Sequence, residues 1–202
     1  MNWGSASIDH QRNLLLANDL RMPISTRLEP RAKVDAMDGI DPHGIYSKMI
    51  GTPYGMYTNN FVSPLGVPCM AAPYGTLSAI DLASRQLVWQ VPVGTVKDTG
   101  PLGLQIGVPF LPGMPTLGGP ISTSGGLVFF SGTQDYYLRA FDTETGQEVW
   151  KGALPTGSQA TPITYMDEKT GRQMVVVTAA GAPHNPKDRQ KAYVIAFALP
   201  AR

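Results

Sequence analysis

One stretch decides the fold of this chain: Ala-Phe-Asp-Thr-Glu-Thr-Gly-Gln-Glu-Val-Trp, residues Ala140–Trp150. Bulky apolar residues alternate with small or polar ones from Tyr137 to Asp142, a pattern that is typical of a half-buried strand. Gly146 permits a tight turn, because glycine adopts positive φ at no steric cost. The stretch therefore predicts a β-hairpin whose return strand ends on a large aromatic residue.

The same pattern occurs earlier in the chain, as Ala79-Ile80-Asp81 followed by Leu87-Val88-Trp89. In both copies the Trp comes eight residues after the Asp, at 89 after 81 and at 150 after 142. A Trp side chain is too large for a lone four-stranded sheet to cover, and the next repeat of a stacked array supplies the missing cover. The repeat predicts a β-propeller. The alternative is that two unrelated hairpins share a short pattern.

Composition limits the classes of protein that this chain can represent. The 202 residues include 22 Gly and 18 Pro, which favour short strands and many turns. Sixteen basic and fifteen acidic residues leave a net charge of +1, so no nucleic-acid partner is expected. No apolar run is long enough for a transmembrane helix, and no signal peptide is recognisable. The single Cys69 excludes an internal disulfide and is expected to be a small buried residue.

Three blades are predicted. The first covers residues 1–94, with Met22–Leu28 as a possible third strand and a long irregular insertion at 29–73 that is rich in Pro and Gly. The second blade covers 118–154, and the third covers 159–199 and lacks its outermost strand. Three blades cannot close a ring, so the expected fold is an all-β, open and incomplete propeller in which 1–202 belong to one domain.

Several segments carry a resemblance to a known family. They are Asn2-Trp3-Gly4, Thr52–Gly55, Pro64–Cys69, Met114–Thr123 and Gln159–Tyr165. They resemble the C-terminal region of the membrane-bound quinoprotein dehydrogenases, which use pyrroloquinoline quinone (PQQ) and include glucose, quinate and polyol dehydrogenases. The resemblance runs from Asn2 to near Pro200 and covers about the last quarter of the family's length. Family members have an N-terminal membrane anchor and an eight-bladed periplasmic propeller.

The resemblance implies a function. In this family PQQ lies near the propeller axis beside a calcium or magnesium ion, which acts as a Lewis acid on the quinone. A carboxylate base takes the proton of the substrate hydroxyl, hydride passes to the quinone, and electrons go to ubiquinone. The implied activity is oxidation of a sugar, polyol or quinate-like alcohol, as in glucose to gluconolactone. The implied location is the periplasmic side of the bacterial inner membrane, and the implied partners are the remaining blades or an upstream partner chain.

Few site residues carry over to this chain. Asn2 matches an Asn whose amide contacts the quinone oxygens, and Trp3 lines the same region. Leu117 matches a position whose backbone contacts the cofactor, with Gly118 and Gly119 allowing a close approach. The structural alternative for Asn2 is that it caps a strand or bonds a loop.

Asp135 matches an Asp close to the cofactor, and the alternative is a turn residue before Tyr136. The catalytic base and the metal ligands match positions upstream of Met1, so no catalytic or metal-binding residue is expected in this chain. His10, His43 and His184 lack partners at metal-ligand spacing and are interpreted as surface or loop residues.

Two questions stay open at the level of sequence. Residues Ala180–Pro186 depart from the Gly-Gly-His-Gly-Ser-Phe-Gly-Thr segment of the glucose type, so another polyol, a cyclitol or quinate fits as well as glucose. The alternatives to an enzyme are a non-catalytic propeller scaffold and an inactive fragment of a split enzyme. The isolated chain is predicted to be inactive, since the base and the metal ligands are missing from it.

Overall fold

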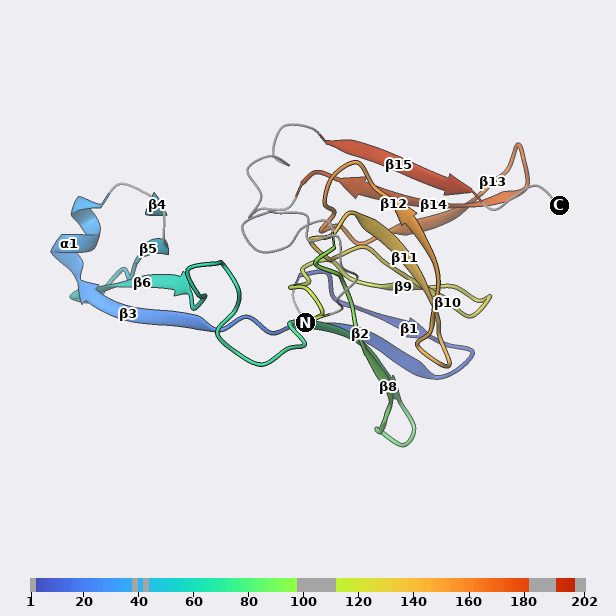
Figure 1. Ribbon diagram of the computed structural model, residues 1–202, viewed down its shortest axis with the longest axis horizontal. Helices are drawn as coiled ribbons and strands as arrows, with labels where there is room; N and C mark the ends of the chain where they lie inside the picture. Colours follow the sequence, from blue (N-terminus) through green and yellow to red (C-terminus); the bar gives the residue numbers. More distant parts are fainter. Residues whose placement is uncertain (1–2, 38–39, 42–43, 98–111, 182–191, 199–202) are drawn as a thin grey trace. The chain divides into compact units, whose positions relative to one another are not determined.

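The chain folds into two compact units in the computed structural model (Figure 1), which describes residues 3–37, 40–41, 44–97, 112–181 and 192–198. Unit 1 comprises Met1–Arg21 and Ala72–Arg202, and unit 2 comprises Met22–Ala71. Unit 2 is therefore inserted into the sequence of unit 1.

The described residues of unit 1 form three antiparallel sheets. The first has the order β1-β2-β7-β8: β1 (Ala6–Asp9), β2 (Leu14–Leu20), β7 (Gly75–Asp81) and β8 (Leu87–Pro92). The second has the order β12-β11-β10-β9: β9 (Ile121–Ser122), β10 (Leu127–Phe130), β11 (Tyr137–Asp142) and β12 (Glu148–Ala153). The third has the order β13-β14-β15: β13 (Ile163–Asp167), β14 (Arg172–Ala179) and β15 (Tyr193–Ala198).

These sheets confirm the predicted fold class. The fold is an all-β, partial propeller with open sheets, and each sheet falls within one of the three predicted blades. In the described part of the chain the third sheet has three strands, and β15 forms one of its edges. The division of the whole chain into three blades of one propeller domain stays a prediction.

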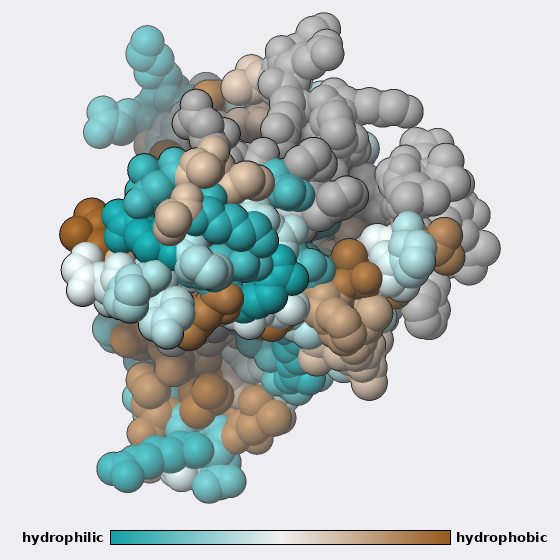
Figure 2. Space-filling view, turned by 90° about the vertical axis from the view of Figure 1, so that its left-hand side faces the viewer, coloured by the Kyte–Doolittle hydropathy of each residue, from teal (hydrophilic) through white to brown (hydrophobic). Residues whose placement is uncertain are grey.

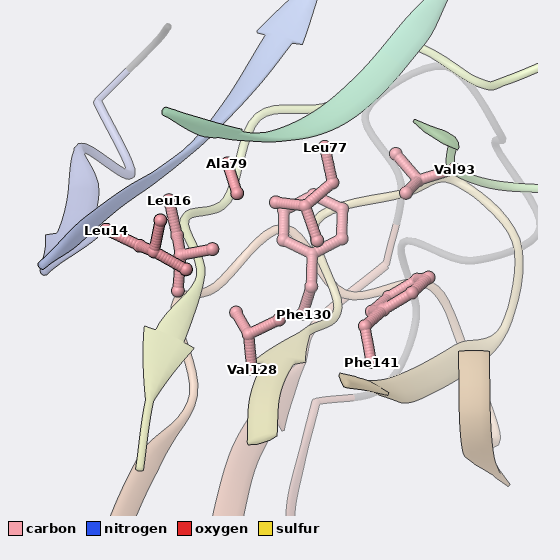
Figure 3. Packing of buried hydrophobic residues seen from close by; sticks show 8 residues of the cluster. All are labelled: Leu14, Leu16, Leu77, Ala79, Val93, Val128, Phe130 and Phe141. Carbon is pink, nitrogen blue, oxygen red and sulfur yellow. The ribbon is translucent and has the colours of Figure 1, made fainter. Parts of the chain in front are cut away.

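Apolar residues from neighbouring sheets form shared cores (Figure 3). The first core joins the first two sheets and is made by Leu14, Leu16, Leu77, Ala79, Val93, Val128, Phe130 and Phe141. Strand β10 serves two cores, because successive side chains of a strand point to opposite faces. Val128 and Phe130 lie in the first core, and Phe129 lies in a second core with Val175 and Val177 of β14.

The two Trp residues contact the neighbouring sheet, as the repeat predicted. The indole N–H of Trp89 on β8 donates to the carbonyl oxygen of Thr143 in the next sheet, at 2.9 Å. Its ring lies over Gly146, where an added Cβ would come within 2.6 Å of the indole. Trp150 on β12 meets Phe197 of β15 edge to face, with ring centroids 5.2 Å apart. The Trp residues therefore link one sheet to the next.

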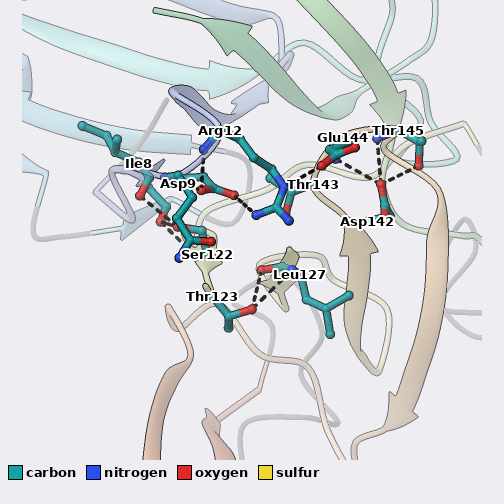
Figure 4. Close-up of polar contacts among 12 residues, drawn as sticks. Ile8, Asp9, Arg12, Ser122, Thr123, Leu127, Asp142, Thr143, Glu144 and Thr145 are labelled. Carbon is teal, nitrogen blue, oxygen red and sulfur yellow. Dashed lines mark hydrogen bonds and ion pairs between the residues drawn. The ribbon is translucent and has the colours of Figure 1, made fainter. Parts of the chain in front are cut away.

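The hairpin turns are organised by aspartate side chains (Figure 4). Asp142 Oδ1 accepts hydrogen bonds from the backbone N–H groups of Glu144 (3.0 Å) and Thr145 (2.9 Å). The hydroxyl and the backbone N–H of Thr145 lower the pKa of Asp142, since both stabilise the ionised carboxylate. Arg12 ties this turn to the first sheet, because it pairs with both Asp9 (3.1 Å) and Glu144 (2.9 Å). Asp142 therefore has a structural role in this turn.

Short turns connect the strands at one end of the sheets, and long connections join them at the other end (Figure 1). The connections at the first end are tight turns: 10–13, 82–86, 123–126, 143–147 and 168–171. The connections at the other end include every long one: 21–74, 93–120, 131–136, 154–162 and 180–192. This end of the sheets is called the loop edge below. Binding residues are concentrated on loops that a rigid scaffold positions, so the loop edge is where a site is expected.

Unit 2 is a folded sheet rather than an irregular insertion. Its strands are ordered β3-β6-β5-β4: β3 (Ile24–Pro30), β4 (Ile40–Asp41), β5 (Gly44–Lys48) and β6 (Tyr54–Asn60). Helix α1 (Arg31–Ala36) places Val34 against Gly55, where an added Cβ would lie 2.5 Å from Val34 Cγ2. The opposite face of the sheet exposes Ile24 and Leu28. Figure 2 shows hydrophobic and hydrophilic residues side by side on the face that it displays.

Two predictions for this region are wrong. The segment 29–73 is not irregular, because it forms β4, β5, β6 and a helix, with Tyr46 and Tyr57 in ring contact at 4.6 Å. The strand predicted at Met22–Leu28 exists as β3, but it pairs with β6 instead of joining the first blade. The third position in that blade belongs to β7, which pairs with β2 from Leu14↔Asp81 to Leu20↔Gly75.

Gly146 and Gly171 offer a matched test of the Trp contact. Both end an Asp-initiated turn at positive φ, +72° and +63°, so an alanine strains the backbone at each by roughly 1–2 kcal/mol. The added Cβ meets Trp89 at Gly146 and open space at Gly171. We expect Gly146→Ala to lower the free energy of unfolding in urea by about 1–3 kcal/mol more than Gly171→Ala. Equal losses would contradict a role of this contact in joining the sheets.

Candidate functional site

The segments that precede the first strands of the three sheets meet at the loop edge. Gly4 precedes β1, Gly119 precedes β9 and Thr161 precedes β13. The backbone N–H of Gly119 donates to Thr161 Oγ1 at 3.0 Å, and this hydroxyl donates to the carbonyl oxygen of Gly4 at 3.4 Å. One residue from the segment before each sheet therefore takes part in a single chain of hydrogen bonds. This meeting point, formed by Gly4, Leu117–Gly119, Gly132 and Gln159–Thr161, is called the junction below.

The junction is packed too closely for side chains at three glycines. A Cβ on Gly119 would lie 1.7 Å from the carbonyl oxygen of Gly4, and one on Gly118 would lie 2.8 Å from that of Ala160. A Cβ on Gly132 would lie 2.7 Å from the nitrogen of Gly118. The close approach that Gly118 and Gly119 allow is therefore an approach between chain segments, which fixes the backbone beside them.

The backbone of Leu117 is held from both sides. Its N–H donates to the carbonyl oxygen of Gly132 at 3.1 Å. The preceding Thr116 is fully buried, and its hydroxyl donates to the carbonyl oxygen of Asp19 and accepts from Asn18 Nδ2, both at 2.8 Å. Leu117 itself is half-buried. A rigid backbone next to a partly accessible side chain suits a position that contacts a bound molecule.

The Asn2-Trp3-Gly4 segment is described only in part. Asn2 lies outside the described residues. Trp3 keeps 70% of its surface exposed, although it directly precedes Gly4 in the junction. The structure thus brings the segment after Asn2 together with Leu117, Gly118 and Gly119, and a contact of any of these residues with a cofactor stays a prediction.

Asp135 is completely buried in an ion pair with Arg139 of β11. Its Oδ1 accepts from Arg139 Nη1 at 2.9 Å and from the hydroxyl of Thr133, and its Oδ2 accepts from the backbone N–H of Thr95 at 2.8 Å and from Arg139 Nη2. Four donors from the protein surround the two carboxylate oxygens. Asp135 therefore braces the segments around Thr95 and Thr133 against β11, a set of contacts that suits a structural role.

Arg139 also bonds Glu148, with its Nε 3.0 Å from Glu148 Oε2. Burial by itself lowers the pKa of a guanidinium, but the charges and hydrogen bonds of Asp135 and Glu148 outweigh burial, so the pKa of Arg139 is raised. Arg139 therefore stays charged, and Asp135 has a permanent cationic partner.

Sequence reasoning missed Thr116, Gly132, Thr161 and Gln159. Gln159 lies two residues before Thr161, as Asn2 lies two before Gly4 and Leu117 two before Gly119. Its amide nitrogen is buried and has no hydrogen-bond partner among the described residues. These residues could have been identified by aligning the three segments with one another, using the strand that follows each segment as the reference.

In the part of the chain that the structure describes, no three His, Cys, Asp or Glu side chains lie close enough together to hold a metal ion. His10 is exposed in a turn, and His43 and His184 lie outside the described residues. The expectation that Cys69 is buried is wrong: its thiol is exposed, since the segment around it forms few strand contacts. No described helix has the length and apolar character needed to span a bilayer.

Comparison with known families decides the family of this chain. The model described as "Glucose/ethanol/alcohol dehydrogenase, beta-propeller domain", of the PQQ type, matches residues 1–175. The chain belongs to this family. This PQQ propeller chain is 53% identical to the probable quinate dehydrogenase (quinone) of Xanthomonas campestris pv. juglandis, over 99% of its own length and 26% of the relative's.

Two further relatives agree with this assignment, and one solved structure shares the fold. Identity is 48% to the quinate/shikimate dehydrogenase (quinone) of Acinetobacter baylyi and 40% to the quinoprotein glucose dehydrogenase of Escherichia coli, each over 98% of this chain and 25% of the relative. The quinohemoprotein alcohol dehydrogenase from Comamonas testosteroni has the same fold, with a TM-score of 0.54 at 24% identity over 88% of this chain and 22% of that one. The PQQ propeller chain thus spans about a quarter of the length of these curated relatives.

Gly119 and Gly125 provide a matched test of the junction. We expect Gly119→Ala to lower the free energy of unfolding by about 1–3 kcal/mol, because its Cβ would overlap a backbone oxygen of the first sheet. Gly125→Ala, whose Cβ would meet only Thr123 Oγ1 at 3.9 Å, should change it by less than about 0.5 kcal/mol. Urea unfolding measures both, and a tolerated Gly119→Ala would contradict the close contact.

The buried ion pair makes a second prediction. Asp135→Ala and Arg139→Met should each lower the free energy of unfolding by about 3–5 kcal/mol. The first change leaves the buried Arg139 paired only with the partly exposed Glu148, and the second leaves Asp135 buried without its cation. Asp142→Ala, which removes the carboxylate of a surface turn, serves as the control and should cost less. Thermal and urea unfolding would reveal the difference. A loss for Asp135→Ala no larger than that for Asp142→Ala would refute the structural role.

Proposed function

We propose that this chain is the part of a PQQ-dependent dehydrogenase that helps to bind and orient the cofactor, in an enzyme that oxidises a cyclic polyhydroxy alcohol of the quinate type. The observation that carries the proposal is the junction. There Gly4 and Gly119 are joined through Thr161 at the loop edge. They lie two residues after Asn2 and Leu117, the two positions matched to cofactor contacts. The family membership supplies the nature of the cofactor.

The residues present fit such a cofactor. PQQ is a flat, anionic molecule whose quinone and carboxylate oxygens accept hydrogen bonds, so its site needs N–H donors on a rigid frame. The amide of Asn2, by resemblance, and the buried amide of Gln159 are neutral donors of this kind. When bound, PQQ supplies the redox chemistry by accepting the hydride of the alcohol carbon.

This chain's own contribution is binding and orientation. Glycine contacts hold the junction, and the buried Asp135–Arg139 pair holds the loops around Thr95 and Thr133. The proton-abstracting carboxylate and the ligands of the calcium or magnesium ion are proposed to lie in the rest of the polypeptide or in a partner chain. The whole protein is proposed to act at the periplasmic side of the inner membrane and to reduce ubiquinone.

Sequence identity favours quinate over glucose as the substrate type. Identity to the relatives named for quinate is 53% and 48%, against 40% to the glucose dehydrogenase of Escherichia coli. The departure of Ala180–Pro186 from the segment of the glucose type supports the same choice. Sites that bond several hydroxyl groups discriminate strongly between alcohols, so the preference should be measurable.

The test uses the full-length protein that contains this chain, loaded with PQQ and calcium. We expect oxidation of quinate and shikimate with a soluble ubiquinone analogue, with kcat/KM at least about tenfold above that for glucose. The same protein without PQQ is the control and should be inactive. A preference for glucose would refute the substrate, and absence of PQQ binding would refute the cofactor and favour the scaffold.

A further inference from the structure

Gln159 precedes the third sheet at the same spacing in sequence at which Leu117 precedes the second sheet and Asn2 the first. Asn2 lies two residues before Gly4, Leu117 two before Gly119, and Gln159 two before Thr161. The equivalence does not rest on sequence spacing alone, because Gly119 and Thr161 are hydrogen-bonded and Thr161 also reaches Gly4. The three segments therefore enter their sheets at the same level of the propeller.

The backbone around Gln159 is fixed. A Cβ on Gly118 would lie 3.0 Å from the carbonyl oxygen of Gln159, so the second and third segments are in direct contact. The neighbouring carbonyl oxygen of Ala160 accepts from Ser131 Oγ at 3.0 Å, and Ser158 Oγ donates to the carbonyl oxygen of Thr178 at 2.8 Å. Gln159 thus starts from a rigid position beside the backbone that also fixes Leu117.

The side chain of Gln159 contrasts with this well-bonded backbone. Its Nε2 is buried and makes no hydrogen bond within the described residues. Buried polar groups are almost always paired, and one that is not needs an explanation, such as a ligand that completes it. The amide carries two N–H donors, so it suits an acceptor oxygen and cannot serve as a proton-abstracting base.

We infer that Gln159 is a cofactor-binding residue, whose amide N–H donates a hydrogen bond to an acceptor oxygen of PQQ. The inference rests on the proposed function and adds a third contact to the two segments matched by resemblance. A neutral donor binds the oxygens of an anionic cofactor without adding a charge to the site. The burial of Gln159 Nε2 strengthens such a bond.

The test measures the affinity for PQQ in the presence of calcium and compares the full-length wild-type apoprotein with its Gln159 variants. Gln159→Met keeps the length of the side chain and removes both donors. Titration followed by the absorbance of PQQ should give a Kd about tenfold higher than that of the wild type, as the loss of one hydrogen bond to a charged or polarised acceptor implies. Gln159→Glu should weaken binding further, because its carboxylate repels those of PQQ.

Two controls separate a binding role from a structural one. Gln147→Met makes the same chemical change at an exposed position at the opposite edge of the second sheet and should leave the Kd unchanged. The apoprotein with Gln159→Met should unfold at the same temperature as the wild type or higher, because an unpaired buried donor has been removed.

The outcomes are distinct. If the wild type fails to bind PQQ, the proposed function fails and the inference falls with it. If the wild type binds and Gln159→Met binds equally well, only the inference is overturned. An apoprotein of Gln159→Met that unfolds at a lower temperature would show that the amide serves the folded chain, and it would also overturn the inference, as would tighter binding by Gln159→Glu than by Gln159→Met.

Discussion

Contact between neighbouring sheets is the constraint on which the rest of unit 1 depends. Each of its two cores is built from two sheets, and β10 contributes alternate side chains to both. Phe130, Leu16 and Leu77 are fully buried there, and burying one such side chain contributes about 1.5–3 kcal/mol. Because each sheet takes its position from the next, the segments that enter the sheets are positioned as well. The junction is a consequence of that packing.

Much of this architecture was predictable from the sequence, because it rests on local patterns. The strand at Tyr137–Asp142 has the predicted bounds, since alternation and the turn residues after it define it. The Trp contacts were also predictable, because an indole has to be covered by something. Unit 2 was not, because its Pro and Gly residues interrupt the alternation and its pairing of β3 with β6 joins segments far apart in sequence.

The candidate site was predictable only in outline. The resemblance pointed to Leu117, Gly118 and Gly119, and the structure brings these residues beside Gly4. It did not reveal that Thr161 bonds Gly119, or that the amide nitrogen of Gln159 is buried with no hydrogen-bond partner among the described residues. Both facts depend on how three sheets stack. The resemblance matched Asp135 to a position near the cofactor, but it did not indicate that Asp135 is paired with Arg139. Arg139 lies on a strand and points into the protein, so this pair depends on the fold.

The insertion of unit 2 between β2 and β7 has a consequence for chain entropy. These two strands are direct neighbours, and Arg21 N–H bonds the carbonyl oxygen of Tyr74 at 2.9 Å where the insertion leaves and returns. In the topology of unit 1, unit 2 is therefore the loop of a hairpin. The entropy of closing such a loop grows slowly, by about 0.6 kcal/mol for each doubling of its length. A shorter or longer segment at this position would leave the pairing of β2 with β7 almost equally favourable, so the length of this insertion is free to vary between relatives.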